Sequence, residues 1–224
     1  MNPVDPASLS ALPVVIGAAR FAPYLAARSG DAAEALRLYS WNVEASAAFL
    51  GAYAALEVGM RNAMHDTLTS VFSSADWWHA VTLAAKDSAQ ISDTETYLDG
   101  RKGAGSWGAG HMVAELKTSF WEGLLTNRYH TLLWEAGLKN AFPNYTGLRD
   151  DLRKQMQRLR LLRNRAAHHE PIFERDLLVD HKFMCELAGY AETDLQTWIA
   201  SHSRVPGVAV AKALTISGAR LTRF

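Results

Sequence analysis

The chain has 224 residues, of which 49% are hydrophobic, so it can bury a sizeable core as one domain or as a domain with an added cap. Its 23 Lys and Arg residues equal its 23 Asp and Glu residues, which excludes a global field that draws the whole protein onto nucleic acid or a membrane. The single cysteine, Cys185, excludes an intramolecular disulfide and a cysteine-based metal cluster built from one chain. The first residues lack the positive start of a signal peptide, and no apolar run reaches the ~20 residues that span a bilayer. We therefore expect a soluble, cytoplasmic protein without membrane contact.

Apolar residues recur at intervals of three and four along the chain, and sustained alternation is hard to find, which predicts an all-α fold. The first segment, about residues 9–28, contains Pro13 and Pro23, each of which is expected to start or kink a short helix. Residues 29–31, Ser-Gly-Asp, then supply a helix stop and a new N-cap. The Ala-, Leu-, Glu- and Met-rich run over residues 32–72 predicts one very long helix, or two that are nearly collinear.

Glycines cluster between Gly100 and Gly110 around Trp107, which predicts a turn-prone loop that acts as a lid or linker. For Trp107 two readings stay open, packing in the core and stacking on a nucleic-acid base. Further helices are expected over residues 112–141, 148–168 and 176–200, and the chain from residue 202 onward is expected to be weakly ordered or to pack on a partner. The predicted organisation is an N-terminal helical extension (1–30), a helical domain (31–203) and a C-terminal tail (204–224).

A cluster of basic residues and histidines lies at the end of the predicted helix over residues 148–168, just before Pro171 disfavours helical geometry. With about 100° of rotation per residue, Asn164 and His168 share a face, whereas Arg163 lies about 140° from His168. Fraying of the helix end, or a second copy of the helix, must therefore bring Arg163 and His168 together. A homodimer that pairs this helix with its symmetry mate would form one composite cleft.

An arginine with a histidine that titrates near neutral pH suits a phosphodiester, and we therefore expect an RNA substrate. In that chemistry a ribose 2′-hydroxyl attacks its own 3′-phosphate, with His168 as base or acid and Arg163 meeting the developing charge. Asn164 would orient the phosphate or the imidazole, and His169 would assist or merely pack. No metal or cofactor is required. The alternative is structural, because cations at a helix C-terminus are favourable in themselves and the Arg-x4-His spacing occurs by chance in many helices.

The string from Leu161 to Ile172 resembles the RNxxAHHEPI signature of the bacterial Abi-like (abortive infection) proteins, members of the HEPN superfamily. Blocks that precede this signature in the family are similar to three further stretches, residues 39–42, 56–63 and 120–143. The similarity covers about residues 32 to 203. The resemblance implies an all-α, HEPN-like helical bundle with a long N-terminal helix and accessory helices. It also implies dimerisation across the Arg-x4-His helices, metal-independent RNA cleavage, and a role in phage defence or as a toxin.

On this resemblance the motif arginine corresponds to Arg163, its polar neighbour to Asn164 and the catalytic histidine to His168. Glu57 and Arg61 are either an intrahelical ion pair at four-residue spacing or part of the second shell of the site, as the family blocks indicate. Glu170 is a further second-shell candidate that would orient a histidine ring. The predicted RNA track, which is equally readable as a solvated face, consists of Arg153, Lys154, Arg158, Arg160 and Arg165.

Three other functional classes stay open at this point. The same fold would serve as a noncatalytic RNA-binding protein, for instance one that holds a structured noncoding RNA. It would also serve as a protein-interaction module in which the motif stabilises a dimer. A third class is a toxin silenced by an antitoxin or another regulatory partner. We expect no metal site, and in particular no zinc site at His111 or His130.

Overall fold

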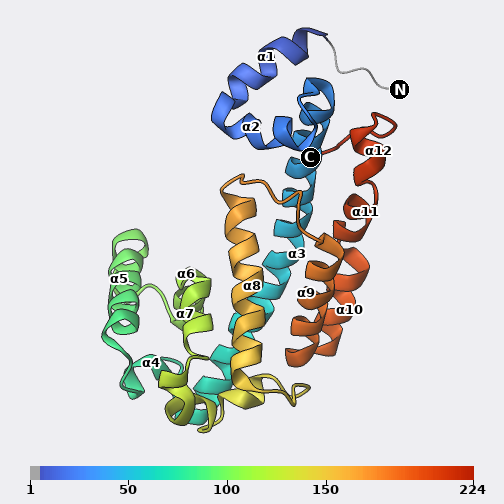
Figure 1. The fold of residues 1–224 in the computed structure, drawn as a ribbon. Coiled ribbons are helices and arrows are strands. Elements are labelled where there is room, and N and C mark those ends of the chain that lie inside the picture. The colour runs from blue at the N-terminus through green and yellow to red at the C-terminus, as the bar shows by residue number, and fades with distance from the viewer. Residues whose placement is uncertain (1–5) are drawn as a thin grey trace. The chain divides into compact units, whose positions relative to one another are not determined.

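The computed structural model describes residues 6–224, with side chains from residue 9 onward, and these residues form helices and connecting turns without a β-strand (Figure 1). The predicted all-α fold class, with a long helix near the N-terminus, is therefore confirmed. The helices are α1 (Pro6–Ile16), α2 (Ala18–Ala27), α3 (Ala32–Phe72), α4 (Trp77–Ala80), α5 (Ala85–Lys102), α6 (Ala109–Glu115), α7 (Thr118–Gly123), α8 (Arg149–Ala167), α9 (Leu177–Ala191), α10 (Thr193–His202), α11 (Val205–Val210) and α12 (Lys212–Ile216). Between α7 and α8 lie three short turns, η1 (Asn127–Tyr129), η2 (His130–Trp134) and η3 (Leu138–Ala141).

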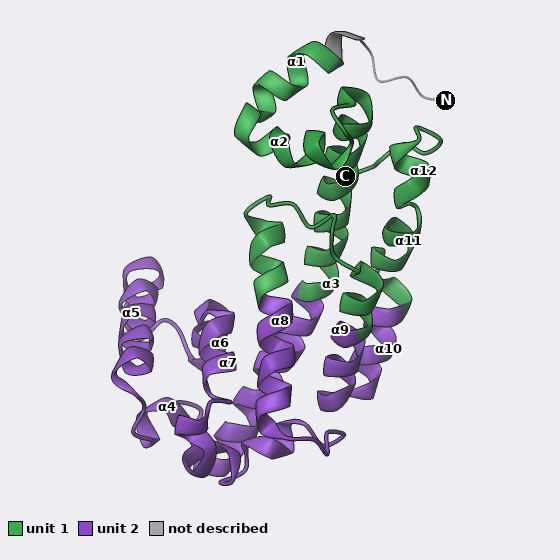
Figure 2. Cartoon of the chain, in the orientation of Figure 1, with its two compact units in different colours: residues 1–53, 161–182, 201–224 green, residues 54–160, 183–200 purple. Residues whose placement is uncertain are grey.

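The chain divides into two compact units, shown in different colours in Figure 2. Unit 1 consists of residues 1–53, 161–182 and 201–224, and unit 2 consists of residues 54–160 and 183–200. Four helices, α3, α8, α9 and α10, contribute residues to both units. The division into residues 1–30, 31–203 and 204–224 stays a prediction.

Helix α3 confirms the expectation of a single long helix, because it runs unbroken for 41 residues. It begins where predicted, and the carboxylate of Asp31 accepts the N–H of Glu34 at 2.8 Å as an N-cap. Gly59 lies inside the helix, where glycine ordinarily costs 0.5–1 kcal/mol relative to alanine. A Cβ at this position would lie 2.3 Å from Leu195 Cδ2, so the missing side chain permits close packing within unit 2.

Helices α1 and α2 form the segment in which Pro13 and Pro23 were each expected to start or kink a short helix. Both prolines lie inside these helices, and the break between the helices falls at Gly17, whose φ of 90° suits glycine. In unit 1 the buried ring of Tyr24 in α2 packs against Tyr39 and Phe173, at centroid distances of 5.2 and 5.1 Å. These ring contacts fix α2 beside α3 and the segment that follows α8.

The segment from residue 204 onward forms the helices α11 and α12 in unit 1, which corrects the expectation of a weakly ordered tail. The indole N–H of Trp41 donates to the carbonyl of Val208 at 2.8 Å, and Arg37 Nε donates to the carbonyl of Ile216 at 2.6 Å. Arg220 forms a two-pronged ion pair with the buried carboxylate of Glu44, with both N···O distances at 2.7 Å. These long-range contacts, which leave no periodic pattern in the sequence, are what order the segment.

Unit 2 is built around aromatic side chains, with the ring of Trp77 in contact with those of Trp78, Phe120 and Trp121. The single helix predicted over residues 112–141 is wrong, because α6, α7 and the three short turns occupy this stretch. Leu116 and Lys117 adopt extended backbone after α6, so the helix cannot continue. The helix predicted over residues 176–200 is likewise divided into α9 and α10 at Glu192, whose carboxylate accepts the N–H of Asp194 at 3.3 Å.

Helix α3 also contains an 18-residue window with a mean hydropathy of 1.2, of which 44% is buried, and so meets the length and composition of a membrane span. This is weak support for a membrane location, because the core helix of a soluble protein passes the same test. Within unit 1 the helix carries Glu44 and Asn42 as buried polar residues, and both have partners inside the protein. The cytoplasmic location stays a prediction.

Candidate active site at the end of helix α8

The end of helix α8 carries the candidate catalytic residues and agrees with the helix predicted over residues 148–168. Leu161, Arg165 and His168 are exposed and follow one another at i, i+4 and i+7, so they share one face of the helix. Arg163 and Asn164 are only partly exposed. Within unit 1 the helix therefore presents a histidine at its end and keeps the arginine and asparagine of the motif closer to the protein.

The last turn of α8 closes as a Schellman motif. The N–H of Glu170 donates to the carbonyl of Arg165 at 2.9 Å, and the N–H of His169 donates to the carbonyl of Ala166 at 3.1 Å. His169 takes the left-handed position of this motif, with φ of 57°, where glycine is usual. A non-glycine residue there is strained by roughly 1–2 kcal/mol. Surrounding contacts must therefore hold the turn in place.

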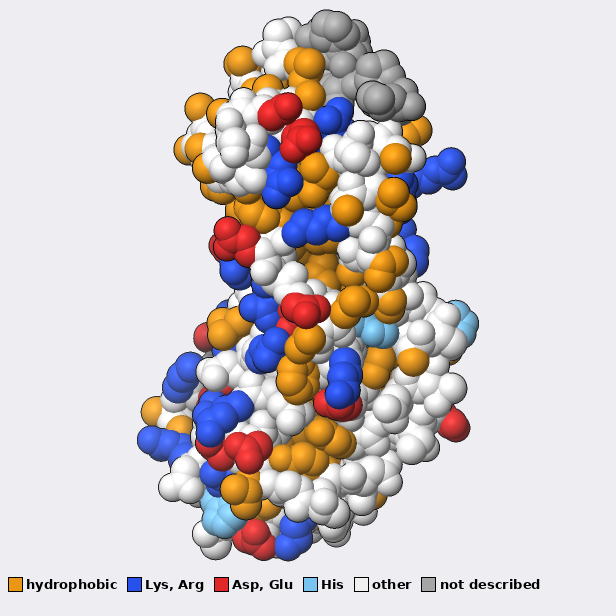
Figure 3. All heavy atoms as spheres, turned by 45° about the vertical axis from the view of Figure 1, so that its right-hand side comes forward, with side chains coloured by type: hydrophobic (Ala, Val, Ile, Leu, Met, Phe, Trp, Pro, Cys, Tyr) orange, Lys and Arg blue, Asp and Glu red, His pale blue; other side chains and the backbone are white. Residues whose placement is uncertain are grey.

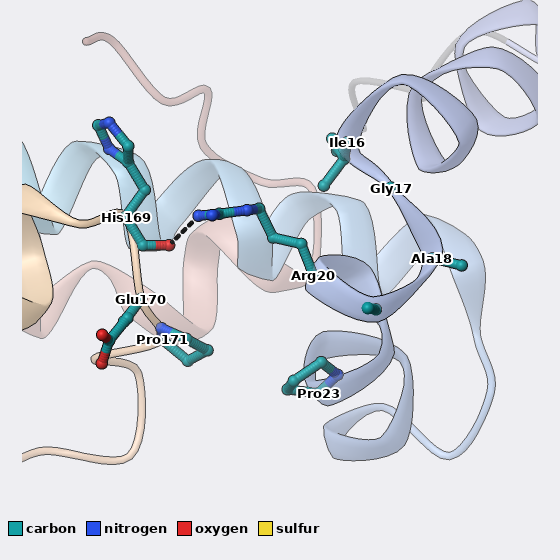
Figure 4. Close-up of a pocket in the computed structure, with 9 residues that line it drawn as sticks. Ile16, Gly17, Ala18, Arg20, Pro23, His169, Glu170 and Pro171 are labelled. Carbon is teal, nitrogen blue, oxygen red and sulfur yellow. Dashed lines mark hydrogen bonds between the residues drawn. The ribbon is translucent and has the colours of Figure 1, made fainter.

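Three side chains bind the carbonyl groups that follow the helix. Arg20 Nη1, from α2, donates to the carbonyl of His169 at 2.8 Å and to that of His168 at 3.4 Å (Figure 4). The side-chain amide of Asn42, from α3, donates to the carbonyl of Glu170 at 3.3 Å, and its oxygen accepts the N–H of Ile172 at 2.7 Å. Arg165 Nη2 donates to the carbonyl of Pro171 at 2.5 Å.

These bonds leave no main-chain polar group unpaired from His168 to the N–H of Ile172. All four carbonyls of residues 168–171 accept a side-chain N–H, and every N–H of the segment has an acceptor, proline having none to offer. Satisfied main-chain groups fix a segment because each bond lost on movement has to be replaced by water. The turn that carries both histidines is therefore held from α2, α3 and α8 at once.

Arg163 and His168 make no bond to each other within one chain. Arg163 Nη1 lies 3.4 Å from Asn164 Oδ1, to which it donates. Among residues 6–224 no hydrogen bond or ion pair joins the side chains of Arg163 and His168. This agrees with the rotation of about 140° between the two positions on a regular helix. The assembly of both residues into one site by a second copy of the chain stays a prediction.

A pocket of about 560 Å³ adjoins the turn after α8 (Figure 4). One wall comes from the junction of α1 and α2, where Ile16, Arg20 and Pro23 take part, and the other comes from residues 169–171. In Figure 4 the guanidinium of Arg20 reaches across to the main chain of His169, while the His169 ring points away from Arg20. The pocket thus lies beside the main chain of the turn rather than beneath the imidazole of His169.

Tyr24 lies close to this turn and is fully buried. Burial, and then the neighbouring Tyr39, raise the pKa of Tyr24 to about 12, while Arg20 and Arg165 act in the opposite direction. The phenol therefore stays protonated and neutral at physiological pH. Its hydroxyl has no hydrogen-bond partner, which makes its packing between rings, rather than a polar contact, its contribution to the site.

Most of the basic side chains in the predicted RNA track contact partners inside unit 2. Arg160 Nε contacts Glu122 at 2.5 Å and Arg153 Nη1 approaches the same carboxylate at 3.7 Å. Lys154 Nζ lies 2.8 Å from Asp150, and this bond first of all, then Arg153, lowers the pKa of the Asp150 carboxyl. The guanidinium of Arg158 lies over the ring of Phe183 at 4.6 Å.

Figure 3 likewise shows Lys and Arg side chains interspersed with Asp and Glu on the face drawn, rather than gathered in one continuous patch. Arg165, in unit 1, pairs with Glu170 at 3.4 Å in addition to its bond to Pro171. A role for these five cations in RNA binding stays a prediction. The exposed pairs among them exchange readily with other anions, because ion pairs in solvent contribute little.

Glu57 and Arg61 belong to unit 2, and the expected ion pair between them is absent among the described residues. Glu57 Oε1 instead accepts the hydroxyl of Thr118 at 2.8 Å, and Arg61 Nη1 donates to the carbonyl of Ala114 at 3.1 Å. The pair does not form because each side chain finds a partner around the junction of α6 and α7. Their second-shell role stays a prediction.

Two other expectations concern Glu170 and Trp107. The Glu170 carboxylate is exposed and pairs with Arg165 rather than with a histidine ring. The indole N–H of Trp107 donates to Asp99 Oδ1 at 2.7 Å, which ties this partly exposed ring to the end of α5. The loop between α5 and α6 spans residues 103–108 only, because α5 continues through Gly100 to Lys102 and α6 begins at Ala109. Stacking of Trp107 on a base stays a prediction.

Sequence reasoning did not single out Arg20 and gave Asn42 no role. The only available signal for Asn42 was its place in a stretch, residues 39–42, that is similar to a block of the Abi-like family. Arg20 lies outside the region of similarity and is one exposed arginine in an apolar segment, so no pattern identified it.

In the described part of the chain, no group of three or more His, Cys, Asp or Glu side chains is placed to hold a metal ion. Comparisons of the whole chain with protein-family models, with curated proteins and with solved structures each give no match. The site is therefore interpreted from its own residues and geometry.

Proposed function

We propose that the chain is a metal-independent endoribonuclease of the HEPN type, acting in bacterial antiphage defence by abortive infection or as a toxin. The observation that carries this proposal is the run from Arg163 to Pro171, whose histidine His168 is exposed at the end of α8 on a turn held by three side chains. A solvent-facing imidazole on a main chain that is held in place suits general acid–base catalysis on a large substrate.

The proposed reaction is attack of a ribose 2′-hydroxyl on the adjacent phosphorus. The bond from oxygen to phosphorus forms as the bond to the 5′-oxygen of the next nucleotide breaks, which leaves a 2′,3′-cyclic phosphate and a 5′-hydroxyl. His168 takes the proton from the attacking hydroxyl or delivers one to the leaving oxygen. Arg163 stabilises the charge that develops on the phosphoryl oxygens. Asn164, to which Arg163 donates at 3.4 Å, orients that guanidinium or the phosphate.

The proposed assembly is a homodimer across the ends of two α8 helices. Its support is the rotation of about 140° between Arg163 and His168 on the helix, together with the exposed face of Leu161, Arg165 and His168. Leu161 is 52% exposed and lies on the same helix face as Arg165 and His168. Covering it with a second copy would bury this apolar side chain and complete a cleft that takes Arg163 from one chain and His168 from the other.

Charge distribution gives the proposal further support. Unit 1, which contains the motif, has eleven Lys and Arg residues and eight Asp and Glu residues, although the whole chain is balanced. A local positive excess attracts the phosphates of RNA without a basic protein overall.

The test is cleavage of total bacterial RNA in EDTA by the wild type, Arg163→Ala and His168→Ala, with end-group analysis of the fragments. His130→Ala, which alters an exposed histidine of unit 2, is the matched control. Cleavage by the wild type and the control, with a loss of about 10²–10⁴-fold in the two motif variants, supports the proposal. Equal background in all four proteins would contradict it, and retained RNA binding would then favour a noncatalytic RNA-binding protein.

Mixing the two inactive variants tests the composite site. About half of the dimers are then mixed, and in each of these one of the two Arg163–His168 pairs of the composite cleft is intact, so roughly a quarter of wild-type activity should return. No recovery, despite subunit exchange shown by native mass spectrometry, would place both residues of each site in one chain.

A further inference from the structure

The contact between Arg20 and the turn after α8 links a helix outside the motif to the candidate catalytic histidine. Arg20 is an exposed residue of α2, 148 positions before His168 in the chain. Its Nη1 donates to the carbonyls of both His168 and His169, at 3.4 and 2.8 Å. The guanidinium thus caps the C-terminus of α8, where the helix dipole leaves a partial negative charge.

Arg20 acts at a point that the other two contacts do not reach. Asn42 and Arg165 bind the carbonyls of Glu170 and Pro171, further along the chain. Among the side chains that the structure describes, from residue 9 onward, only that of Arg20 donates to the carbonyls of His168 and His169. Without it these carbonyls would turn to solvent, and the strained left-handed geometry of His169 would lose the contact nearest to it.

We propose that Arg20 is a positioning residue for the candidate site, which holds the main chain of His168 and His169 so that the His168 imidazole is presented at one place. This inference rests on the proposed function. Arg20 touches no reacting group in it, and acts through the carbonyl oxygens of the histidines. The binding of substrate is expected to be nearly independent of Arg20, whereas the chemical step depends on the position of the imidazole.

Three variants test the role. Arg20→Ala removes the contact, and Arg20→Lys keeps a cation and an N–H donor on a flexible stem. Arg37→Ala is the matched control, because Arg37 also belongs to unit 1 and also donates to a carbonyl at a helix C-terminus, that of Ile216 at 2.6 Å. Each variant is measured by amide hydrogen exchange of His169 and Glu170, and by kcat and KM on an RNA oligonucleotide that the wild type cleaves.

For Arg20→Ala we expect faster exchange at His169 and Glu170 and a fall in kcat of about 10- to 100-fold, with KM nearly unchanged. Arg20→Lys should restore part of both the exchange protection and kcat. Arg37→Ala should leave the exchange at His169 and kcat as in the wild type, even where its melting temperature falls as far as that of Arg20→Ala.

Unchanged exchange at the two amides in Arg20→Ala would overturn the inference, and so would faster exchange with an undiminished kcat. Equal losses of kcat in Arg20→Ala and Arg37→Ala would show a general effect on folding and would overturn it as well. Absence of cleavage by the wild type counts against the proposed function instead. The amide exchange and the mobility of the His168 ring measured by NMR then decide, without activity, whether Arg20 holds the turn.

Discussion

The two compact units differ in the balance of what their basic side chains bind. In unit 1, Arg20, Arg37 and Lys212 donate to main-chain carbonyls, although Arg220 pairs with a carboxylate. In unit 2, Arg160 and Lys154 face carboxylates, although Arg61 donates to a carbonyl. A cation on a carbonyl keeps its full charge, whereas a cation on a carboxylate is neutralised by its partner.

The totals follow the same division. Unit 1 has eleven Lys and Arg against eight Asp and Glu, and unit 2 has twelve against fifteen. The net charge of zero for the whole chain is therefore the sum of a positive charge on unit 1 and an equal negative charge on unit 2. The positive charge is on unit 1, which contains the motif. Attraction to nucleic acid should therefore be judged from the net charge of each unit and not from that of the whole chain.

The largest expected effect on stability comes from removing the carboxylate of Glu122 in unit 2. Glu122 is almost buried and faces both Arg153 and Arg160, which are themselves about one-fifth exposed. Glu122→Ala leaves the partly buried Arg160 without a carboxylate and leaves Arg153 with Asp150 alone, and it should lower the free energy of unfolding by about 3 kcal/mol. Urea unfolding followed by tryptophan fluorescence measures this, because six of the seven tryptophans lie in unit 2.

The control for that experiment is Glu135→Ala, which removes an exposed carboxylate of unit 2 that pairs with Lys139 at 2.9 Å. Its urea midpoint should stay at the wild-type value, since exposed ion pairs contribute little. If the midpoint of Glu122→Ala also stays at the wild-type value, Arg153 and Arg160 are free to turn to solvent. Their predicted role in binding RNA would then gain support.

The corresponding break in unit 1 is Arg220→Ala, which leaves the buried carboxylate of Glu44 without its two-pronged partner. Unfolding should cost roughly 2–3 kcal/mol less than in the wild type. Faster amide exchange in α11 and α12 would locate the effect. The opposite result, a stable variant with full protection, would show that the aromatic contacts alone order these helices.

The same pair sets an acid dependence. The hydrogen bond from Arg220, ahead of all other causes, lowers the pKa of the Glu44 carboxyl below its ordinary value of 4.5. The unfolded chain therefore binds the proton at higher pH than the folded chain, and stability is present above pH 4.5 and is lost as the pH falls through the lowered pKa. A plot of unfolding free energy against pH should be flatter in this range for Arg220→Ala, and parallel curves would contradict the pairing.

A smaller effect is expected at the left-handed residues that end α8 and α3. His169 in unit 1 has φ of 57° and Ser73 in unit 2 has φ of 52°. Replacing either by glycine should raise stability by about 1 kcal/mol, because glycine adopts this conformation without strain. If His169→Gly cleaves RNA like the wild type, His169 only packs at the helix end. A loss of cleavage with raised stability would give the side chain a functional role, and Ser73→Gly serves as the control for strain relief alone.

The smallest expected effect is a dependence on mildly acidic pH in unit 2. Burial lowers the pKa of His65 below its ordinary 6.5, against the opposing effects of Asp66 and Asp76, and the indole N–H of Trp77 donates to its Nδ1 at 3.2 Å. The folded state thus keeps the imidazole neutral while the unfolded chain takes up a proton, so stability falls as the pH drops below 6.5. His65→Gln should flatten the melting temperature between pH 7 and 5. An unchanged slope would assign the dependence to another group.

Local signals explain which parts of the fold were predictable. The long helix α3 has its cap at Asp31, and α8 ends before Pro171, so both were located from sequence. The interruption at Leu116 has no such signal, because the aromatic residues on either side are buried by turns rather than by one helix face. Glu192, which divides α9 from α10, is an ordinary helix-forming residue.

The candidate site divides in the same way. Arg163, Asn164 and His168 lie close together in the chain and form a recognisable motif, so they could be located from the sequence. Arg20 and Asn42 reach the motif from 149 and 128 positions away, and a single hydrogen bond to a main-chain carbonyl leaves no periodicity behind. Contacts of this kind become visible only when the chain is folded.

The pairing of Arg220 with Glu44 has a consequence for genetic screens. A frameshift that replaces the residues from 220 onward spares every residue of the motif, yet it strands a carboxylate in the interior of unit 1. On the proposed function as a toxin, clones selected for loss of growth inhibition would include late frameshifts beside changes at His168. The amount of soluble protein in the cell distinguishes the two kinds of clone. It falls in the late frameshifts and stays unchanged in the His168 variants.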